Sequence, residues 1–252
     1  MSKNYKKINA AIIIIGNEIL SGRTEEKNIK FISSWLNEKI GITVKEVRII
    51  PDIKREICKS VLVLSKKFDY VFTTGGIGPT HDDITALSIS KAFNLAYEIN
   101  ITAKKQLKTH YNKPGELTEA RLKMAYMPKG ANLINNPVSF APGFNIKNIF
   151  VFPGVPQIME SMFLEFVDSI TEKRSIPQVS ISTILSEGVI ADFIGKIQKE
   201  NNNVKIGSYP YFKDGDFGVT LVIKCESDFN LKNVSKKIFT YLIKLNGDPK
   251  YL

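Results

Sequence analysis

The chain has 252 residues, of which 43% are hydrophobic, and it carries a formal net charge of +10 at pH 7. No apolar run approaches the ~20 residues that a transmembrane helix needs, and no signal-peptide core follows the basic N-terminus, so we expect a cytoplasmic protein with no membrane partner. Cys58 and Cys225 lie far apart in the sequence and form no metal motif with His81 and His110, so no structural zinc site is expected. The dispersed lysines favour an anionic metabolite over nucleic acid as the partner.

The first half of the chain alternates predicted strands and helices. The apolar run 9–15 is typical of a strand that is buried on both faces. Further strands are expected over 42–50 and 70–74. Helices are expected over 27–39, from Pro51 onward with Ile53, Ile57, Val61 and Leu64 on one side, and over 82–93. This β-α-β-α-β-α order predicts a mostly parallel sheet that helices cover on both faces.

The second half predicts a break between two domains. After a helix that ends near residue 111 and a region of loops, a strand over 148–152 leads into a helix that ends near residue 170. The polar stretch 171–178 fits a boundary. Beyond it we expect a strand (179–185), a helix (189–200), a hairpin (204–209 and 218–225) around Lys213-Asp214-Gly215, and a closing helix (231–245). The domains are thus residues 1–172, of α/β class, and residues 178–252, a small α+β unit of order β-α-β-β-α.

The strongest local motif lies between a predicted strand and a predicted helix. It reads Thr74-Gly75-Gly76-Ile77-Gly78-Pro79-Thr80-His81-Asp82-Asp83. Glycines at such a junction let backbone N–H groups point at an anion, and the helix N-terminus adds positive potential. The motif is neither a Walker A loop nor the dinucleotide G-x-G-x-x-G. The competing interpretation is a tight turn followed by a capping box of Thr80 and Asp83.

Three further loops follow the other predicted strands. They contain Gly16 and Glu18, Asp52, and Pro153-Gly154. Because loops after parallel strands meet at one edge of the sheet, Glu18, Asp52, Asp82 and Asp83 should gather around the glycine loop. Carboxylates beside a phosphate cradle suit a Mg²⁺-type site. The structural alternatives are helix caps at Thr24 and Asp52 and a rigid turn that places Pro156 first in a helix.

Taken in order, these loops resemble the molybdopterin-binding fold of the MoaB/MogA proteins, and more closely the N-terminal region of the CinA (competence/damage-inducible) family. The resemblance rests on four stretches of this sequence, and the tail resembles the small KH-like domain that follows in that family. These stretches are Gly16–Gly22, Thr74–Thr85, Asn136–Phe144 and Pro153–Pro156. The chain departs from the family pattern at Glu26, where Asp is usual, and at Ser139, where Gly is usual. Nothing in it matches the family's C-terminal nicotinamide-nucleotide deamidase domain, so deamidase activity is not expected.

The resemblance implies a three-layer α/β fold and a metal-dependent pyrophosphatase that acts on ADP-ribose or a similar dinucleotide. It assigns catalysis to Asp83 and Asp52, and a divalent metal (Mg²⁺, Mn²⁺ or Co²⁺, with potassium as a further candidate) to Asp83, Asp82 and Asp52. The ligand-binding residues it implies are Gly16, Glu18, Thr74, Gly75, Gly76, Gly78, Pro79, Thr80, Pro153 and Gly154. Arg23, Arg121 and Lys123 are either outer phosphate contacts or solvated charges. The family's oligomers imply a homo-oligomer.

Two other functions stay open at this point. The first is a molybdopterin-binding or adenylyl-transfer protein of cofactor biosynthesis, because that chemistry needs the same loop and carboxylates. The second is a non-catalytic module that binds nucleic acid through its KH-like tail. Against the second, no GXXG loop, with which KH domains clamp nucleotides, lies between helices of this sequence.

Overall fold

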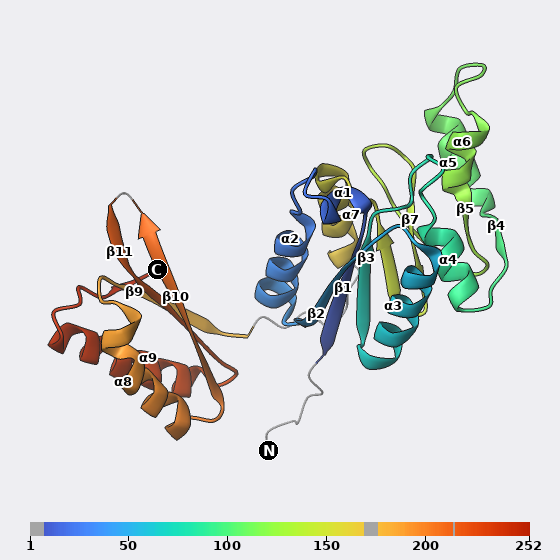
Figure 1. Cartoon of the computed structure of the whole chain (residues 1–252). Coiled ribbons are helices and arrows are strands. Elements are labelled where there is room, and N and C mark those ends of the chain that lie inside the picture. The colour runs from blue at the N-terminus through green and yellow to red at the C-terminus, as the bar shows by residue number, and fades with distance from the viewer. Residues whose placement is uncertain (1–7, 169–175, 214) are drawn as a thin grey trace. The chain divides into compact units, whose positions relative to one another are not determined.

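The computed structural model describes residues 8–168, 176–213 and 215–252. The chain forms two compact units, Met1–Arg174 and Ser175–Leu252 (Figure 1). Most of the boundary expected at 171–178, the end of the helix expected near Ile170, and Asp214 of the expected turn lie outside the described residues.

A six-stranded sheet forms the centre of the first unit, in the order β2-β1-β3-β8-β7-β6. The strands β2, β1, β3 and β8 are parallel, whereas β7 and β6 run antiparallel to their neighbours. The bounds are β1 Asn9–Ile15, β2 Thr43–Ile50, β3 Tyr70–Thr74, β6 Asn132–Ile134, β7 Gly143–Ile146 and β8 Ile149–Phe152. The mostly parallel α/β sheet predicted from the sequence is confirmed.

Helices cover both faces of this sheet because β1 is apolar on both sides. Ile13 and Ile15 belong to one buried cluster with residues of α3, α4 and α5, and Ile12 and Ile14 belong to another with residues of α2 and α7. The helix bounds are α1 Asn17–Leu20, α2 Asn28–Trp35 with the π-helical turn η1 Leu36–Ile40, α3 Lys54–Lys67, α4 Thr85–Ala92, α5 Ile101–His110 and α7 Pro156–Asp168. None of the helices in the described ranges is both long and apolar enough to cross a membrane.

Three local predictions for the first unit were wrong. Ile53 does not lie on the buried side of α3: it precedes that helix and is 51% exposed. The helix expected from residue 82 begins only at Thr85. The region 101–145 contains more regular structure than expected, in elements of only three or four residues. These are α6 Glu119–Leu122, η2 Lys123–Ala125, β5 Tyr126–Pro128, β6 and β7, and β5 pairs with β4 Tyr97–Ile99.

The second unit is a four-stranded antiparallel sheet, ordered β10-β11-β9-β12, with two helices. Its order along the chain is β-α-β-β-α-β, one strand more than the sequence predicted. The bounds are β9 Gln178–Thr183, α8 Glu187–Glu200, β10 Val204–Lys213, β11 Asp216–Cys225, α9 Asp228–Lys244 and β12 Lys250–Tyr251. Residues of both helices and of the three longer strands share one buried core, so the unit has an apolar interior of its own.

Candidate functional site

The loop after β3 requires glycine at two successive positions. Gly75 and Gly76 have φ angles of 98° and 69°, in the region that favours glycine. A Cβ atom on Gly75 would lie 2.1 Å from the carbonyl oxygen of Ile15, and one on Gly76 would lie 2.2 Å from Oγ1 of Thr85. The end of β1 and the start of α4 therefore both contact the backbone of this loop.

The N–H of Gly75 donates to the Phe152 carbonyl at 3.1 Å, but the next three N–H groups of the loop have no partner among the described residues. Thr85 donates its N–H to the Gly76 carbonyl and its hydroxyl to the Gly75 carbonyl, each at 3.0 Å, so α4 holds the carbonyl side of the loop. Within the described ranges, the N–H groups of Gly76, Ile77 and Gly78 have no hydrogen-bond partner. Half-buried N–H groups call for an acceptor. Three in succession at a strand–helix junction form a cradle suited to an anion such as a phosphate.

Asp82 and Asp83 lie beside this cradle in a turn closed by Thr80. Asp83 accepts a hydrogen bond from the Thr80 N–H at 2.8 Å, and Asp82 accepts one from the Thr80 hydroxyl at 2.6 Å. The hydroxyl bond, followed by a backbone hydrogen bond, lowers the pKa of Asp82. Only half of the capping box expected from Thr80 and Asp83 forms, because the Asp83 N–H donates to the Thr80 carbonyl and not to its hydroxyl. The turn does not cap a helix, since the N-cap of α4 is Ile84. Neither carboxylate is fully buried, so both can contact a ligand next to the glycine loop.

Asp52 and Glu18 come from the neighbouring loops. Asp52 does not cap α3, as the alternative interpretation had it. It accepts the N–H of Asn17 at 2.8 Å and so ties the loop after β2 to the loop after β1. Burial raises the pKa of Asp52, and the charges of Glu18 and Asp82 raise it further. The carboxylate of Glu18 folds over Gly16, where an added Cβ would lie 2.5 Å from it. The loops after β1, β2 and β3 thus bring Asp52, Glu18 and Asp82 into one electrostatic neighbourhood.

These acids fit a metal that is shared with a ligand. In the part of the chain that the structure describes, no group of three or more His, Cys, Asp or Glu side chains is placed to hold an ion by itself. Mg²⁺, however, is commonly bound by one or two carboxylates, water and the phosphates of a substrate. Asp52, with Glu18 and Asp82 nearby, together with the N–H cradle matches that division of ligands.

The loop after β8 joins the site through Asn28, a residue that the sequence analysis did not assign. Asn28 is only 4% exposed, and its Nδ2 donates to the Gly154 carbonyl at 2.9 Å and to Oγ1 of Thr74 at 3.4 Å. Gly154 in turn packs against Gly75, since an added Cβ would lie 3.3 Å from the Gly75 Cα. Glu26, where the family pattern has Asp, accepts the N–H of Asn28 at 2.9 Å. The substitution therefore keeps a carboxylate at the start of α2, where it holds Asn28 in place.

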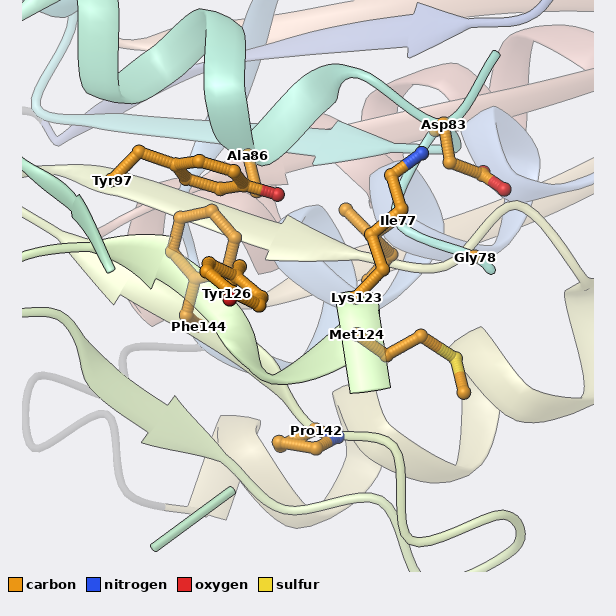
Figure 2. A pocket seen from close by; sticks show the side chains of 11 residues that line it. Ile77, Gly78, Asp83, Ala86, Tyr97, Lys123, Met124, Tyr126, Pro142 and Phe144 are labelled. Atoms are coloured by element: carbon orange, nitrogen blue, oxygen red, sulfur yellow. The ribbon is translucent and has the colours of Figure 1, made fainter. Parts of the chain in front are cut away.

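A small aromatic pocket opens on the other side of the glycine loop (Figure 2). Its lining combines the cradle and Asp83 with side chains from the short elements that the sequence analysis missed. These side chains are Tyr97, Lys123, Met124, Tyr126 and Phe144. The rings of Tyr97 and Tyr126 lie 5.4 Å apart, and burial raises the pKa of the Tyr97 phenol. The pocket thus places aromatic side chains next to the N–H cradle.

The three basic residues suggested as outer phosphate contacts lie in different surroundings. Lys123 donates its ammonium group to the carbonyl of Thr80, so it lies at the glycine loop. Arg121 instead donates to the Glu116 carbonyl and stacks over the ring of Tyr111 at 4.3 Å. Arg23 is exposed and forms no described side-chain bond. Of the three, only Lys123 lines the pocket.

Comparisons with known proteins agree with this architecture. Residues 11–173 match the family described as a probable molybdopterin binding domain, and residues 177–245 match the FAD synthase middle domain. A protein of Pyrococcus abyssi is 37% identical over 218 residues, which cover 81% of this chain and 85% of that protein. The crystal structure of the CinA protein from Thermoplasma acidophilum, described as of unknown function, has 35% identity and a TM-score of 0.60 and covers 64% of this chain and 97% of that one.

A third relative has a name taken from flavin-nucleotide chemistry. A protein of Caenorhabditis elegans called a probable FAD synthase is 35% identical over 253 residues, which cover 89% of this chain. They cover 48% of that protein, so the chain spans about half the length of this relative.

Proposed function

The chain belongs to the family of probable molybdopterin-binding domains, and we propose that its first unit binds a phosphorylated nucleotide and hydrolyses a phosphoanhydride bond in it. ADP-ribose or a similar dinucleotide is the proposed substrate. The observation that carries the proposal is the row of three unpartnered N–H groups at Gly76, Ile77 and Gly78, beside carboxylates from two other loops. A phosphate that accepts these N–H groups would lie next to Asp83 and Lys123.

The side chains around the cradle have separable roles in this proposal. Lys123 and the free N–H groups offset the charge of the phosphates. Asp52 and Asp83 orient the attacking water and, with Asp82, would hold a divalent metal, which would stabilise the leaving phosphate. Asn28 fixes the relative position of the loops after β3 and β8, so that the phosphate meets a rigid site.

A second candidate, adenylyl transfer, is favoured by the match of residues 177–245 to the FAD synthase middle domain. The relatives called probable FAD synthases also contain sequence similar to the first unit. Hydrolysis and transfer would use the same cradle and the same carboxylates. They differ in whether water or a second phosphorylated molecule attacks the phosphorus atom, so the products distinguish them.

The test is turnover of ADP-ribose, FAD and coenzyme A with and without Mg²⁺, Mn²⁺ or Co²⁺. We expect metal-dependent release of AMP from ADP-ribose by the wild type, and a loss on the order of 100-fold in Asp83→Ala, because the carboxylate at the cradle is removed. Asp192→Ala, which removes an exposed carboxylate on α8, is the matched control and should retain full activity.

Two outcomes would redirect the assignment. If all three substrates stay intact with every metal, the hydrolase proposal is wrong. If the protein instead forms FAD from FMN and ATP, and Asp83→Ala does not, the site performs adenylyl transfer.

A further inference from the structure

The sheet of the second unit is covered on one side only. The helices α8 and α9 lie on one side of it (Figure 1), and buried residues of β10 and β11, such as Val204 and Ile223, share a core with them. On the same side of β10, the Ser208 hydroxyl donates to Glu187 of α8 at 2.6 Å. Because side chains alternate along a strand, the residues between these point to the opposite side, which no helix of the unit covers. We define the open sheet face by the residues Lys205, Gly207, Tyr209, Tyr211, Gly218, Thr220, Val222 and Lys224.

Two tyrosine rings lie flat on this face, each over a glycine. A Cβ atom on Gly207 would lie 2.7 Å from the ring of Tyr209, and one on Gly218 would lie 2.7 Å from the ring of Tyr211. One face of each tyrosine ring thus packs against the space that a glycine leaves on the sheet. The outer side of Tyr209 stays open, since this residue is 58% exposed. A flat, outward-facing aromatic ring on a sheet is a platform on which a base can stack.

Two lysines lie directly opposite each other on the same face. Lys205 of β10 pairs in register with Lys224 of β11, and neither has an ion pair in the described ranges. Like charges directly opposite each other destabilise a sheet. Lys250 of β12, which pairs with Asp248, is in register with Ser182 of the adjacent strand. An anion held between Lys205 and Lys224 would relieve their repulsion.

The distance between these features points to the class of ligand. Lys205 and Tyr209 are four residues apart on one strand, which is roughly 13 Å at the rise of a β-strand. A strand of nucleic acid carries both stacking bases and phosphates over such a distance, so it can contact Tyr209 and Lys205 at once. We propose that the open sheet face binds single-stranded nucleic acid. This mode, in which bases stack on aromatic side chains of a four-stranded sheet, differs from the GXXG clamp that the sequence lacks.

The experiment measures binding by the whole 252-residue chain. Fluorescence anisotropy of labelled single-stranded RNA and DNA 12-mers is followed at several salt concentrations. We expect saturable binding that weakens as salt rises. Tyr209→Ala should weaken it roughly tenfold, whereas Tyr209→Phe should bind like the wild type because the ring is kept. No saturable binding by the wild type at low salt would overturn the proposal.

A matched pair of double variants tests the lysines. Lys205→Gln/Lys224→Gln should lower the slope of log affinity against log salt by about 1.4, the value for two lost phosphate contacts on a single strand. Lys236→Gln/Lys237→Gln removes the same charge from exposed positions on α9 and should leave the slope unchanged. If both pairs lower the slope equally, the open sheet face is not the site. Removing two opposed like charges should not lower the thermal stability of the Lys205→Gln/Lys224→Gln variant. A lower salt slope in this variant would therefore reflect lost phosphate contacts and not misfolding.

Discussion

At the residue scale, substitutions at two glycines with the same φ angle can distinguish the cost of backbone strain from the cost of a steric clash. Gly22 and Gly76 both have a φ of 69°, but a Cβ on Gly22 would meet nothing within 4 Å, whereas one on Gly76 would meet Thr85. We expect Gly22→Ala to lower the free energy of unfolding by about 1 kcal/mol, the cost of left-handed backbone alone. Gly76→Ala should cost roughly 1–3 kcal/mol more through overpacking. Urea denaturation measures both, and equal losses would contradict the packing that shapes the cradle.

Asp52 gives a prediction about pH. Its pKa is raised above the ordinary value of 3.8, first by burial and then by the charges of Glu18 and Asp82. An acid with a raised pKa in the folded state favours the fold at low pH, and this contribution is lost as pH rises from about 3.8 through the raised value. Asp52→Asn keeps an acceptor for the Asn17 N–H but cannot ionise.

The variant should therefore gain stability relative to the wild type as pH rises from 4 to 7. Denaturant unfolding at both pH values measures the change. A stability difference that stays constant or moves in the opposite direction would show that burial and the neighbouring carboxylates do not raise the pKa of Asp52. The same measurement with Mg²⁺ and ADP-ribose present should reduce the gain, because a bound cation would offset the repulsion among the acids.

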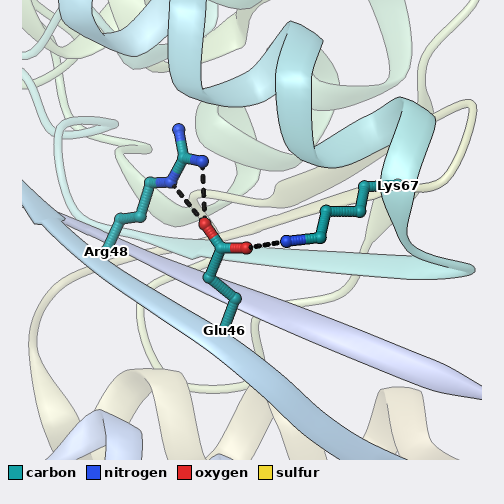
Figure 3. Close-up of polar contacts among 3 residues, drawn as sticks. All are labelled: Glu46, Arg48 and Lys67. Carbon is teal, nitrogen blue, oxygen red and sulfur yellow. Dashed lines mark hydrogen bonds and ion pairs between the residues drawn. The ribbon is translucent and has the colours of Figure 1, made fainter.

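At the scale of elements, Glu46 links the edge strand β2 to the end of α3 (Figure 3). It accepts hydrogen bonds from Lys67 and from Arg48, both at 2.7 Å, and these contacts lower its pKa, the Lys67 bond most. A lowered pKa adds stability above the ordinary value of 4.5 and loses it as pH falls through the lowered value.

We expect Glu46→Gln to lower the free energy of unfolding at pH 7 by less than about 1 kcal/mol, because the lysine is largely exposed. The loss should shrink in high salt and at acidic pH. Glu38→Gln, at an exposed glutamate with no described partner, is the matched control and should be neutral. An equal effect in both variants would mean that Glu46 does not connect the two elements.

Sequence patterns predicted the helices and strands that are long enough to show a repeating pattern of apolar residues. The apolar run at 9–15 and the stripe formed by Ile57, Val61 and Leu64 correspond to β1 and α3, because burial on a sheet imposes these patterns. The elements β4, β5, β6 and β7 have three or four residues each, too few for a pattern. Sequence reasoning therefore treated their region as loops. The strand β12 has two residues and was missed for the same reason.

The residues of the candidate site likewise differ in whether the local sequence could predict them. The glycine loop could be proposed because a glycine cluster between a strand and a helix has a local physical meaning. Asn28 and Tyr97 could not, since the first acts through the carbonyl of Gly154, 126 residues away, and the second lies on the three-residue strand β4. Lys123 was proposed only as one of three equivalent basic residues. Its selection over Arg121 depends on the fold of α6 and η2.

At the scale of the whole molecule, the two proposed ligand sites lie in separate units. The glycine loop and all the carboxylates around it belong to Met1–Arg174, and the open sheet face belongs to Ser175–Leu252. Each unit has its own apolar core. The second unit is small, so its core supports only marginal stability.

If each unit is a folding domain, each should keep its own function when it is produced separately. We expect residues 1–174 alone to hydrolyse ADP-ribose at a rate similar to that of the whole chain. Residues 176–252 alone should unfold cooperatively, since Ile181, Leu221 and Ile238 at its centre are fully buried within the unit. Circular dichroism during thermal unfolding measures the second expectation. If the first fragment is folded but inactive, and adding the second restores turnover, the second unit contributes to the catalytic site, and the assignment of hydrolysis to the glycine loop alone is wrong.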